Sequence, residues 1–445
     1  MSATDTIIAL STPPGISALA IVRLSGPDVV VYTNALLAAP REWTPQHAVY
    51  VHLRDQGQLL DEAVATYWKG PHSFTGEDTM EISCHGNPLI AQNILQAFIH
   101  QGARPAEPGE FTQRAFLNGK LDLTQAEAVL DLIHASTERA LVGAQAMKEG
   151  RLAEKLNQLR HQLIDLLAHL EAYIDFPEED IEPETGETFL GRIDTMRQEV
   201  IALLQTAPLG RILREGITTA IVGAPNVGKS SLLNALLHES RAIVSATPGT
   251  TRDTIEAECN VRGFRLLLVD TAGQRETHDE IEAEGVRRAQ SVAQRADLIL
   301  HVFEAPHALT AFDAELQASL QDRLYLPVAN KVDLGRHPDH QNALAVSTRT
   351  SQGLAELEDA IEKRLIGSQR PADTGWLTIN ARQEAALHRA EEALGRAASG
   401  LTGGLAPELI SIDLRAALNE IGQIVGLATN EDILDQLFKN FCIGK

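Results

Sequence analysis

The chain of 445 residues has little cysteine. Its three cysteines, Cys84, Cys259 and Cys442, are too few and too scattered for a disulfide framework or a zinc site, which need paired or clustered spacings. This scarcity fits a reducing compartment. No base lies beside Cys442 in the sequence to activate its thiol, so we expect Cys442 to be a buried structural residue.

Basic side chains are also scarce, because 38 Lys and Arg stand against 60 Asp and Glu and give a formal net charge of −22. Binding nucleic acid by charge alone requires a basic surface, so any RNA contact must be local or shared with a partner. No apolar run approaches the ~18 residues of a membrane span. The first ten residues contain Asp5 and lack the basic region of a signal peptide. We therefore expect a cytoplasmic protein that is neither secreted nor inserted in a membrane.

The length predicts about three domains at ~150 residues each. Residues 1–118 are rich in Gly and Pro and contain short apolar runs such as Ile7–Leu10 and Ala20–Leu24, which is typical of an α+β domain. Leucines at three- and four-residue spacings between Leu152 and Ile174 then predict a long amphipathic helix. The leucine stripe is explained by packing against neighbouring helices.

Strand-like runs alternate with helical segments in the next part of the chain, as in a parallel α/β sheet. The four runs are residues 218–222, 266–269, 298–303 and 326–329. Helical patterns return from residue 380 to 435. We therefore predict an α+β domain at 1–118, an all-α helical domain in two parts at 119–213 and 377–445, and an inserted α/β domain at 214–376.

The segment Gly223-Ala-Pro-Asn-Val-Gly-Lys-Ser230 matches the phosphate-binding motif G-x-x-x-x-G-K-[ST], follows an apolar strand and opens a helix. Its glycines let backbone N–H groups approach phosphate oxygens, and the helix N-terminus adds positive potential. We expect Lys229 to reach the β- and γ-phosphates and Ser230 to bind Mg²⁺. The inserted domain is therefore predicted to be a Ras-like P-loop nucleotide-binding domain.

Further segments follow in the order that a GTPase requires. Thr251 lies in a predicted switch segment, Thr247–Asp253, where it can bind Mg²⁺, and Asp270-Thr-Ala-Gly273 places Asp270 near the metal and the Gly273 N–H near the γ-phosphate. Asn330-Lys-Val-Asp333 ends a strand, and its last carboxylate can accept the N1 and N2 protons of guanine, a donor pair that adenine lacks. Val346–Thr350 is a weaker match to the last loop that contacts the base.

Two residues are candidates for orienting the attacking water. Gln274 directly follows the Asp-Thr-Ala-Gly segment, where Ras-like GTPases place a glutamine. Glu282 lies in the acidic segment His278–Gly285, and one acid in such a run is more often part of a solvated face. The residues alone leave both candidates open.

Four blocks of the sequence resemble the tRNA-modifying GTPase family MnmE (TrmE): Thr12–Gly26, Gly70–Gly86, Pro108–Val129 and the terminal Phe441–Lys445. The resemblance covers the whole chain. It implies a homodimer through the N-terminal domains, a site there for 5-formyltetrahydrofolate or a related reduced folate, and a flavoprotein partner, MnmG (GidA), in a heterotetramer. Together the two proteins would place an aminomethyl-type group on C5 of the wobble uridine, position 34, of certain tRNAs. It also implies that GTP hydrolysis requires K⁺.

The same resemblance assigns roles to individual residues. Folate would be bound by Arg23, Glu81, Lys120 and Lys445, and K⁺ by Asn226, Ser245, Thr247 and Thr250. Glu282 falls where the family has its water-orienting acid, and the family more often has an apolar residue where Gln274 stands, so the share of each in catalysis stays open. The expected GTP contacts are Asn226, Val227, Gly228, Lys229, Ser230, Ser231, Ser245, Ala246, Thr247, Pro248, Gly249, Thr250, Thr251, Asp270, Thr271, Ala272, Gly273, Asn330, Lys331, Asp333, Ser347, Thr348 and Arg349.

Two other functions stay open beside this one. A ribosome-assembly GTPase that switches on rRNA would be expected to carry a basic RNA module with a GXXG loop, and the C-terminal segment has no such loop. A folate-dependent one-carbon transferase with a regulatory GTPase would share the N-terminal evidence. Nucleoside analysis of tRNA from cells lacking the protein separates the three.

Overall fold

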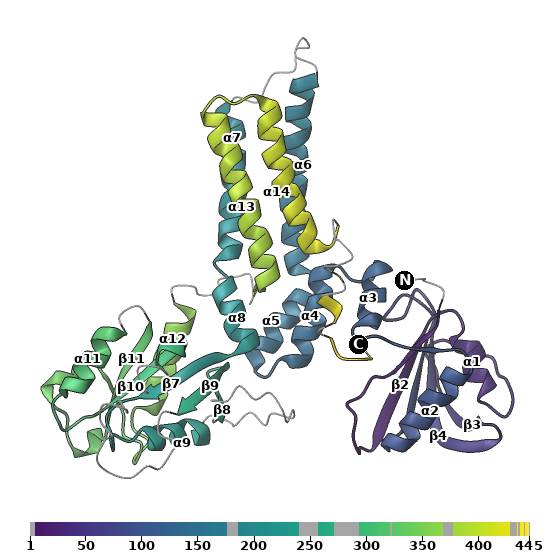
Figure 1. Cartoon of the computed structure of the whole chain (residues 1–445), viewed down its shortest axis with the longest axis horizontal. Coiled ribbons are helices and arrows are strands. Elements are labelled where there is room, and N and C mark those ends of the chain that lie inside the picture. The colour runs from purple at the N-terminus through teal and green to yellow at the C-terminus, as the bar shows by residue number, and fades with distance from the viewer. Residues whose placement is uncertain are drawn as a thin grey trace. The chain divides into compact units, whose positions relative to one another are not determined.

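The structure is a computed structural model of the chain (Figure 1). It describes residues 5–175, 186–239, 257–270, 293–320, 323–367, 377–427, 434, 437–439 and 441–444. The chain forms two compact units. The first comprises Met1–Leu130, Lys148–Leu190 and Arg396–Lys445, and the second comprises Asp131–Met147 and Gly191–Gly395.

A six-stranded sheet with the order β3-β4-β5-β2-β1-β6 forms the N-terminal part of the first unit. Its strands are β1 (Ile7–Leu10), β2 (Leu19–Ser25), β3 (Ala48–Asp55), β4 (Gln58–Trp68), β5 (Thr79–His85) and β6 (Arg104–Pro105). Neighbouring strands are antiparallel except β1 and β6, which are parallel. The two strands predicted from the apolar runs are confirmed as β1 and β2.

Helices α1 (Val29–Ala35) and α2 (Pro88–His100) pack on one face of this sheet, where Val22 and Ile82 are buried with Phe98. Residues at alternate strand positions point to the other face, because side chains alternate along a strand. There Leu19, Tyr50 and Val64 are 60%, 59% and 40% exposed. The sheet therefore has one covered face and one face with apolar side chains in contact with solvent.

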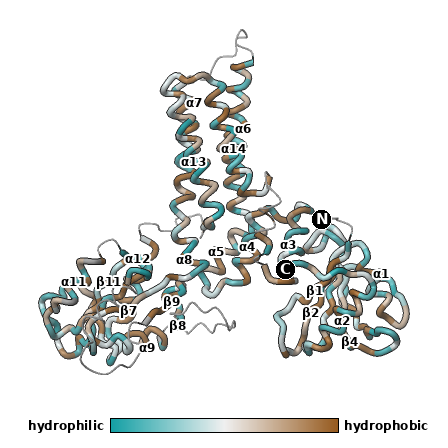
Figure 2. The backbone as a smooth tube through the Cα atoms, viewed as in Figure 1, coloured by the Kyte–Doolittle hydropathy of each residue, from teal (hydrophilic) through white to brown (hydrophobic). Residues whose placement is uncertain are grey.

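The remaining helices that lie wholly or mostly in the first unit are α3 (Glu110–Leu117), α4 (Leu123–His134), α6 (Arg151–Asp175) and α14 (Pro407–Val425). The predicted leucine-rich helix is confirmed as α6, and the six leucines between Leu152 and Leu170 that recur at three- and four-residue spacings are buried. Helix α14 packs along α6, and Figure 2 shows hydrophobic and hydrophilic bands alternating along both. The burial of one face is what holds these two helices together.

The second unit contains a sheet with the order β12-β11-β10-β7-β9-β8. Its strands are β7 (Ile217–Val222), β8 (Ala257–Val261), β9 (Phe264–Asp270), β10 (Leu298–Glu304), β11 (Leu324–Asn330) and β12 (Leu344–Ala345). Only the β8–β9 pair is antiparallel. The four predicted strands are confirmed as β7, β9, β10 and β11, whereas β8 was not predicted because only Cys259 and Val261 of this edge strand are buried.

The helices of the second unit are α5 (Glu138–Lys148), α7 (Gly186–Leu204), α8 (Ala207–Glu215), α9 (Lys229–Glu239), α11 (Ala311–Ser319), α12 (Leu354–Ile366) and α13 (Ala381–Thr402), with short 3₁₀ turns η1 (Val332–Leu334) and η2 (Pro338–His340). The α/β sheet begins after α8 and ends before α13. The expected fold class is thus confirmed: an α+β N-terminal domain, an all-α helical domain and an inserted Ras-like α/β domain.

None of the helices in the described parts of the chain is long and apolar enough to cross a membrane. Across the same residues, no group of three or more His, Cys, Asp or Glu side chains is arranged to hold a metal ion.

Candidate GTP and folate sites

The phosphate-binding segment joins the end of β7 to the start of α9. Gly228 has a φ of +100°, and a Cβ there would lie 2.2 Å from Asn330 Nδ2, so only glycine allows this close approach. Asn226 also lies in the left-handed region, with a φ of 65°. Lys229 Nζ donates to Gly223 O at 3.1 Å and to Ala224 O at 2.9 Å. The lysine head therefore already lies over the loop that the motif predicts.

The loop after β11 is tied to the phosphate-binding loop. Asn330 is fully buried, its Nδ2 donates to Val227 O at 3.0 Å, and its Oδ1 accepts from Thr348 N at 3.2 Å. Lys331 Nζ donates to Asn226 O at 2.8 Å and to Glu304 Oε1 at 2.9 Å. Three segments that are far apart in the sequence are thus brought together at one end of the parallel sheet.

Asp333 is the carboxylate that the sequence assigns to guanine. Ser347 Oγ donates to its Oδ1 at 2.7 Å, and Arg349 Nη2 lies 2.9 Å from its Oδ2. The hydrogen bond from Ser347 lowers the pKa of Asp333, burial opposes this, and the charge of Arg349 lowers it further. The group is therefore a carboxylate at neutral pH, as acceptance of two guanine protons requires. Two residues of the weak match at Val346–Thr350, Ser347 and Arg349, thus contact Asp333.

Several predicted residues lie outside the described parts of the chain. They are Ser245, Ala246, Thr247, Pro248, Gly249, Thr250, Thr251, Thr271, Ala272, Gly273, Gln274, Glu282 and Lys445. Asp270 ends β9, and its backbone pairs with Ile221 of β7. Ser230 and Ser231 are exposed in the first turn of α9. Of the proposed cation ligands, the structure therefore describes Asn226 for K⁺ and Ser230 for Mg²⁺.

A second group of charged and aromatic side chains surrounds Arg23 in the N-terminal sheet. Arg23 Nε donates to Glu81 Oε1 at 2.9 Å, since the two residues are register partners on β2 and β5. The guanidinium carbon of Arg23 lies 5.9 Å from the Phe74 ring centre and 5.8 Å from that of Phe111. Lys120 Nζ donates to Pro71 O at 2.9 Å, at the start of the loop that carries Phe74. The structure therefore brings Arg23 and Glu81 together and places Lys120 on the neighbouring loop.

The end of the chain reaches the same group. Gly444 O accepts hydrogen bonds from Arg23 Nη1 at 3.3 Å and from Ser11 Oγ at 3.1 Å. Phe441 is buried against Phe438 and α4. Gly109 has a φ of +71°, and a Cβ there would lie 2.7 Å from Phe438 O, so its lack of a side chain makes room for the tail.

The expectation of a buried Cys442 is wrong, because this cysteine is exposed. Its neighbours in the tail occupy the buried positions instead: Phe441 is 5% exposed, and Gly444 is also buried. The other two cysteines, Cys84 and Cys259, are buried.

Sequence reasoning missed Phe74, Phe111 and Ser11 as neighbours of Arg23. Both phenylalanines lie inside blocks that carry the family resemblance, Gly70–Gly86 and Pro108–Val129. An aromatic residue within such a block was the available signal, since aromatic faces attract a guanidinium. Only folding shows that both rings flank the same arginine.

Comparisons with known proteins agree with this architecture. A family model described as GTP-binding protein TrmE N-terminus matches residues 6–120, and one described as MnmE helical domain matches residues 123–442. A solved structure of Aquifex aeolicus Era with GDP and aluminium fluoride is 28% identical, covers 40% of this chain and 66% of that chain, and has a TM-score of 0.26, which by itself assigns nothing.

Relatives named tRNA modification GTPase MnmE match along their full length. The Geobacillus kaustophilus protein is 44% identical over 100% of both chains. The Akkermansia muciniphila protein is 44% identical over 99% of both, and the Aquifex aeolicus protein is 44% identical over 99% of this chain and 100% of its own. The chain therefore belongs to the MnmE (TrmE) family of tRNA modification GTPases and is a GTP hydrolase that acts in tRNA modification.

Proposed function

We propose that this GTPase depends on K⁺ and works with the flavoprotein MnmG to place an aminomethyl-type group on C5 of the wobble uridine, position 34, of certain tRNAs. The observation that carries the proposal is the presence in one chain of two assemblies. One is the guanine loop around Asp333 and Ser347, and the other is the Arg23 group with its aromatic neighbours. A protein that acted only as a GTPase switch would not require the Arg23 group.

Nucleoside analysis of bulk tRNA tests this function. Cells lacking the protein should lose the aminomethyl-type modification at position 34, and the wild-type gene should restore it. Unchanged tRNA nucleosides together with a defect in ribosome assembly would favour the rRNA switch instead. Unchanged tRNA together with loss of a one-carbon transfer would favour the folate-dependent transferase.

The proposed nucleotide site uses the phosphate-binding loop, the Asp270 segment and the guanine loop. GTP would replace the loop carbonyls of Gly223 and Ala224 as partners of the Lys229 ammonium. Mg²⁺ would be held by Ser230 and Thr251. Ser230 is exposed in the first turn of α9. K⁺ would be held by Asn226 with Ser245, Thr247 and Thr250, and would supply positive charge to the phosphates during hydrolysis. Glu282 is proposed to orient the water, with Gln274 as the alternative.

The proposed folate site consists of Arg23, Glu81, Lys120 and the terminal Lys445. Two features support it: the Arg23 guanidinium and the partly exposed Phe74 ring offer a cation and an aromatic face, and Gly444 of the tail lies beside Arg23. Arginine suits a glutamyl carboxylate, and a carboxylate suits the donors of a pterin. Calorimetric titration of 5-formyltetrahydrofolate into the intact chain and into a chain ending at Asn440 tests it. Equal affinity of the two forms would exclude the tail, and no binding to either would remove folate.

We also propose a homodimer through the N-terminal domains and a heterotetramer with MnmG. The dimer is supported by the uncovered sheet face, on which Tyr50 and Val64 are exposed. Light scattering should give twice the chain mass for the wild type and the mass of one chain for Val64→Glu, and a wild-type monomer would exclude the dimer. We also propose a cytoplasmic location, because the proposed substrate is tRNA. The proposed domain limits remain 1–118, 119–213, 214–376 and 377–445, and the family matches at 6–120 and 123–442 support the first boundary.

A further inference from the structure

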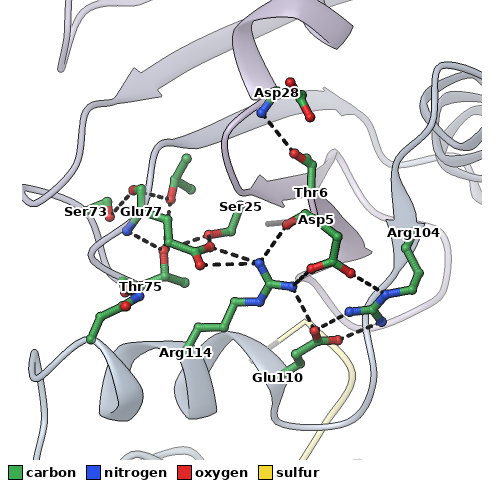
Figure 3. Close-up of polar contacts among 12 residues, drawn as sticks. Asp5, Thr6, Ser25, Asp28, Ser73, Thr75, Glu77, Arg104, Glu110 and Arg114 are labelled. Atoms are coloured by element: carbon green, nitrogen blue, oxygen red, sulfur yellow. Dashed lines mark hydrogen bonds and ion pairs between the residues drawn. The ribbon is translucent and has the colours of Figure 1, made fainter. Parts of the chain in front are cut away.

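Five charged side chains, Asp5, Glu77, Arg104, Glu110 and Arg114, form a cluster in the N-terminal domain, and Arg114 of α3 is at its centre (Figure 3). Arg114 Nη2 donates to Asp5 Oδ1 at 2.6 Å and to Glu110 Oε1 at 3.0 Å, and its Nη1 donates to Glu77 Oε2 at 3.1 Å. The Arg114 side chain is 9% exposed and that of Glu110 is 3% exposed. One planar guanidinium thus joins three carboxylates from three separate segments.

The Glu77 contact fastens the loop between β4 and β5 to α3. Glu77 Oε2 also accepts from Ser25 Oγ at 2.8 Å, and Ser25 Oγ lies 2.7 Å from Thr75 Oγ1. Asn118 Nδ2, at the end of α3, donates to Thr75 O at 2.7 Å. Ser25 and Thr75 are fully buried, so the hydrogen bond between them is shielded from water. The loop is therefore held at Thr75 and Glu77, directly after Phe74.

Arg114 also lies one helical turn after Phe111 on α3, so both side chains are on the same face of that helix. Phe111 is fully buried in a cluster with Ile7 and Ala9 of β1, and Phe74 packs against this cluster. The two rings that flank Arg23 thus come from the two segments that Arg114 joins: Phe111 from α3, and Phe74 from the loop that Glu77 fastens.

We propose that Arg114, acting through Glu77, is a positioning residue for the ligand of the Arg23 site: it holds Phe74 beside Arg23 and against the buried cluster of Phe111, so that a flat aromatic ligand meets a preformed aromatic wall. This inference rests on the proposed folate function for the identity of the ligand. A preorganised Phe74 ring favours binding, because the loop between β4 and β5 loses no further conformational freedom when the ligand binds.

Arg104 is the matched control within the same cluster. Its Nε donates to Asp5 Oδ2 at 2.7 Å and its Nη2 to Glu110 Oε1 at 2.5 Å, so it shares two carboxylates with Arg114. Among the described residues, the Arg104 side chain makes no hydrogen bond or ion pair to the loop between β4 and β5, which contains Phe74. Removing Arg104 therefore weakens the cluster without loosening that loop, whereas Glu77→Ala loosens the loop and leaves Arg114 its pairs with Asp5 and Glu110.

The experiment uses the full chain labelled with 4-fluorophenylalanine, with the Phe74 ¹⁹F signal assigned by its loss in Phe74→Leu. Spectra, thermal unfolding and calorimetric titration with 5-formyltetrahydrofolate are compared for the wild type, Glu77→Ala and Arg104→Gln. Glu77→Ala should move or broaden the Phe74 signal and weaken folate binding about tenfold, as expected when a binding wall must be ordered by the ligand. Arg104→Gln should lower the unfolding temperature and leave both the Phe74 signal and the affinity unchanged.

Each outcome decides the proposal. An unchanged Phe74 signal and unchanged affinity in Glu77→Ala overturn it, and so do equal changes in Arg104→Gln, because the cluster would then act only on stability. If the wild type binds no folate, the proposed folate function fails, and the Phe74 signal is then compared in Glu77→Ala and Arg114→Gln: a change in both supports positioning of this ring by Arg114 through Glu77, and a change in Glu77→Ala alone assigns it to the Ser25–Glu77 bond instead.

Discussion

Ser347 Oγ donates to Asp333 Oδ1 at 2.7 Å, joining the last loop of the sheet to the carboxylate that the sequence assigns to guanine. The two residues belong to different loops, and this bond orients the carboxylate before a nucleotide arrives. Arg349 contributes an ion pair to the other oxygen at 2.9 Å. The proposed selectivity for guanine would therefore depend on the contacts of one side chain.

Asp333→Asn should weaken GTP binding and favour xanthosine triphosphate, because the amide presents a donor to the N1 proton of guanine. The loss should be on the order of 10- to 100-fold, as expected when a buried donor pair loses its acceptor. Fluorescence titration of the two nucleotides measures it. Asp359→Asn, an exposed change on α12, is the control and should alter neither affinity. Equal binding of ATP and GTP by the wild type would contradict the assignment of Asp333.

Asn226→Ala should abolish the activation of GTP hydrolysis by K⁺ and leave nucleotide binding largely intact. In the wild type, turnover should rise steeply with K⁺ and not with Na⁺, by a factor on the order of that supplied by an arginine finger, ~10³–10⁵.

Because Asn226 has a φ of 65°, alanine there also strains the backbone. Asn226→Gly removes the carboxamide without that strain and should lose the K⁺ response equally. A normal K⁺ response in Asn226→Gly would show that the side chain is not a ligand.

Glu282→Ala should lower kcat by about 10²-fold, the effect of losing a group that positions water, whereas Gln274→Leu should cost less than about tenfold. The reason is that the family resemblance places the water-orienting acid at Glu282. Single-turnover hydrolysis under saturating GTP and K⁺ measures both variants. The opposite ranking would assign the role to Gln274, as in Ras-like GTPases.

Acid should destabilise the N-terminal domain through Glu110. Burial disfavours its charge, but hydrogen bonds from Arg104, the Glu107 N–H and Arg114 outweigh burial and hold the pKa of Glu110 below its ordinary value of 4.5. The unfolded chain then takes up a proton at higher pH than the folded one. The stabilisation by this group is complete above about pH 4.5 and is lost as the pH falls through the lower folded pKa.

Calorimetric unfolding of the wild type and Glu110→Gln checks this. The wild type should be more stable at neutral pH, and the difference should shrink in acid. Glu107→Gln, an exposed neighbour, serves as the control and should change little at any pH. A difference between wild type and Glu110→Gln that is constant from pH 7 to about pH 3.5 would show that ionisation of Glu110 does not contribute.

Cys442 should be the one thiol that reacts rapidly with Ellman's reagent in the folded protein. Burial raises the pKa of the Cys84 thiol and raises that of Cys259 to about 12, so neither forms the reactive thiolate near neutral pH. All three should react after denaturation. Cys442→Ser should remove the rapid phase, and a rapid phase that survives this change would place one of the other cysteines at the surface.

Local sequence was enough to predict the nucleotide-binding unit. Glycine spacing, flanking apolar strands and the order of the motifs are properties of short segments, and a parallel sheet brings the carboxyl ends of its strands to one edge. The structure agrees with this rule at Asn330, whose side chain lies against Gly228. The long helix α6 was equally predictable, since its leucine spacing follows the helical period.

The environment of Arg23 was decided only by tertiary structure. Glu81, Phe74, Phe111 and Gly444 come from four separate segments, and the last lies 421 residues away along the chain. No periodic pattern relates such positions, because their meeting depends on strand register and on how α3 and the tail pack. The same holds for Cys442: its sequence offered no base and favoured burial, whereas packing buried Phe441 and Gly444 on either side and left the thiol in solvent.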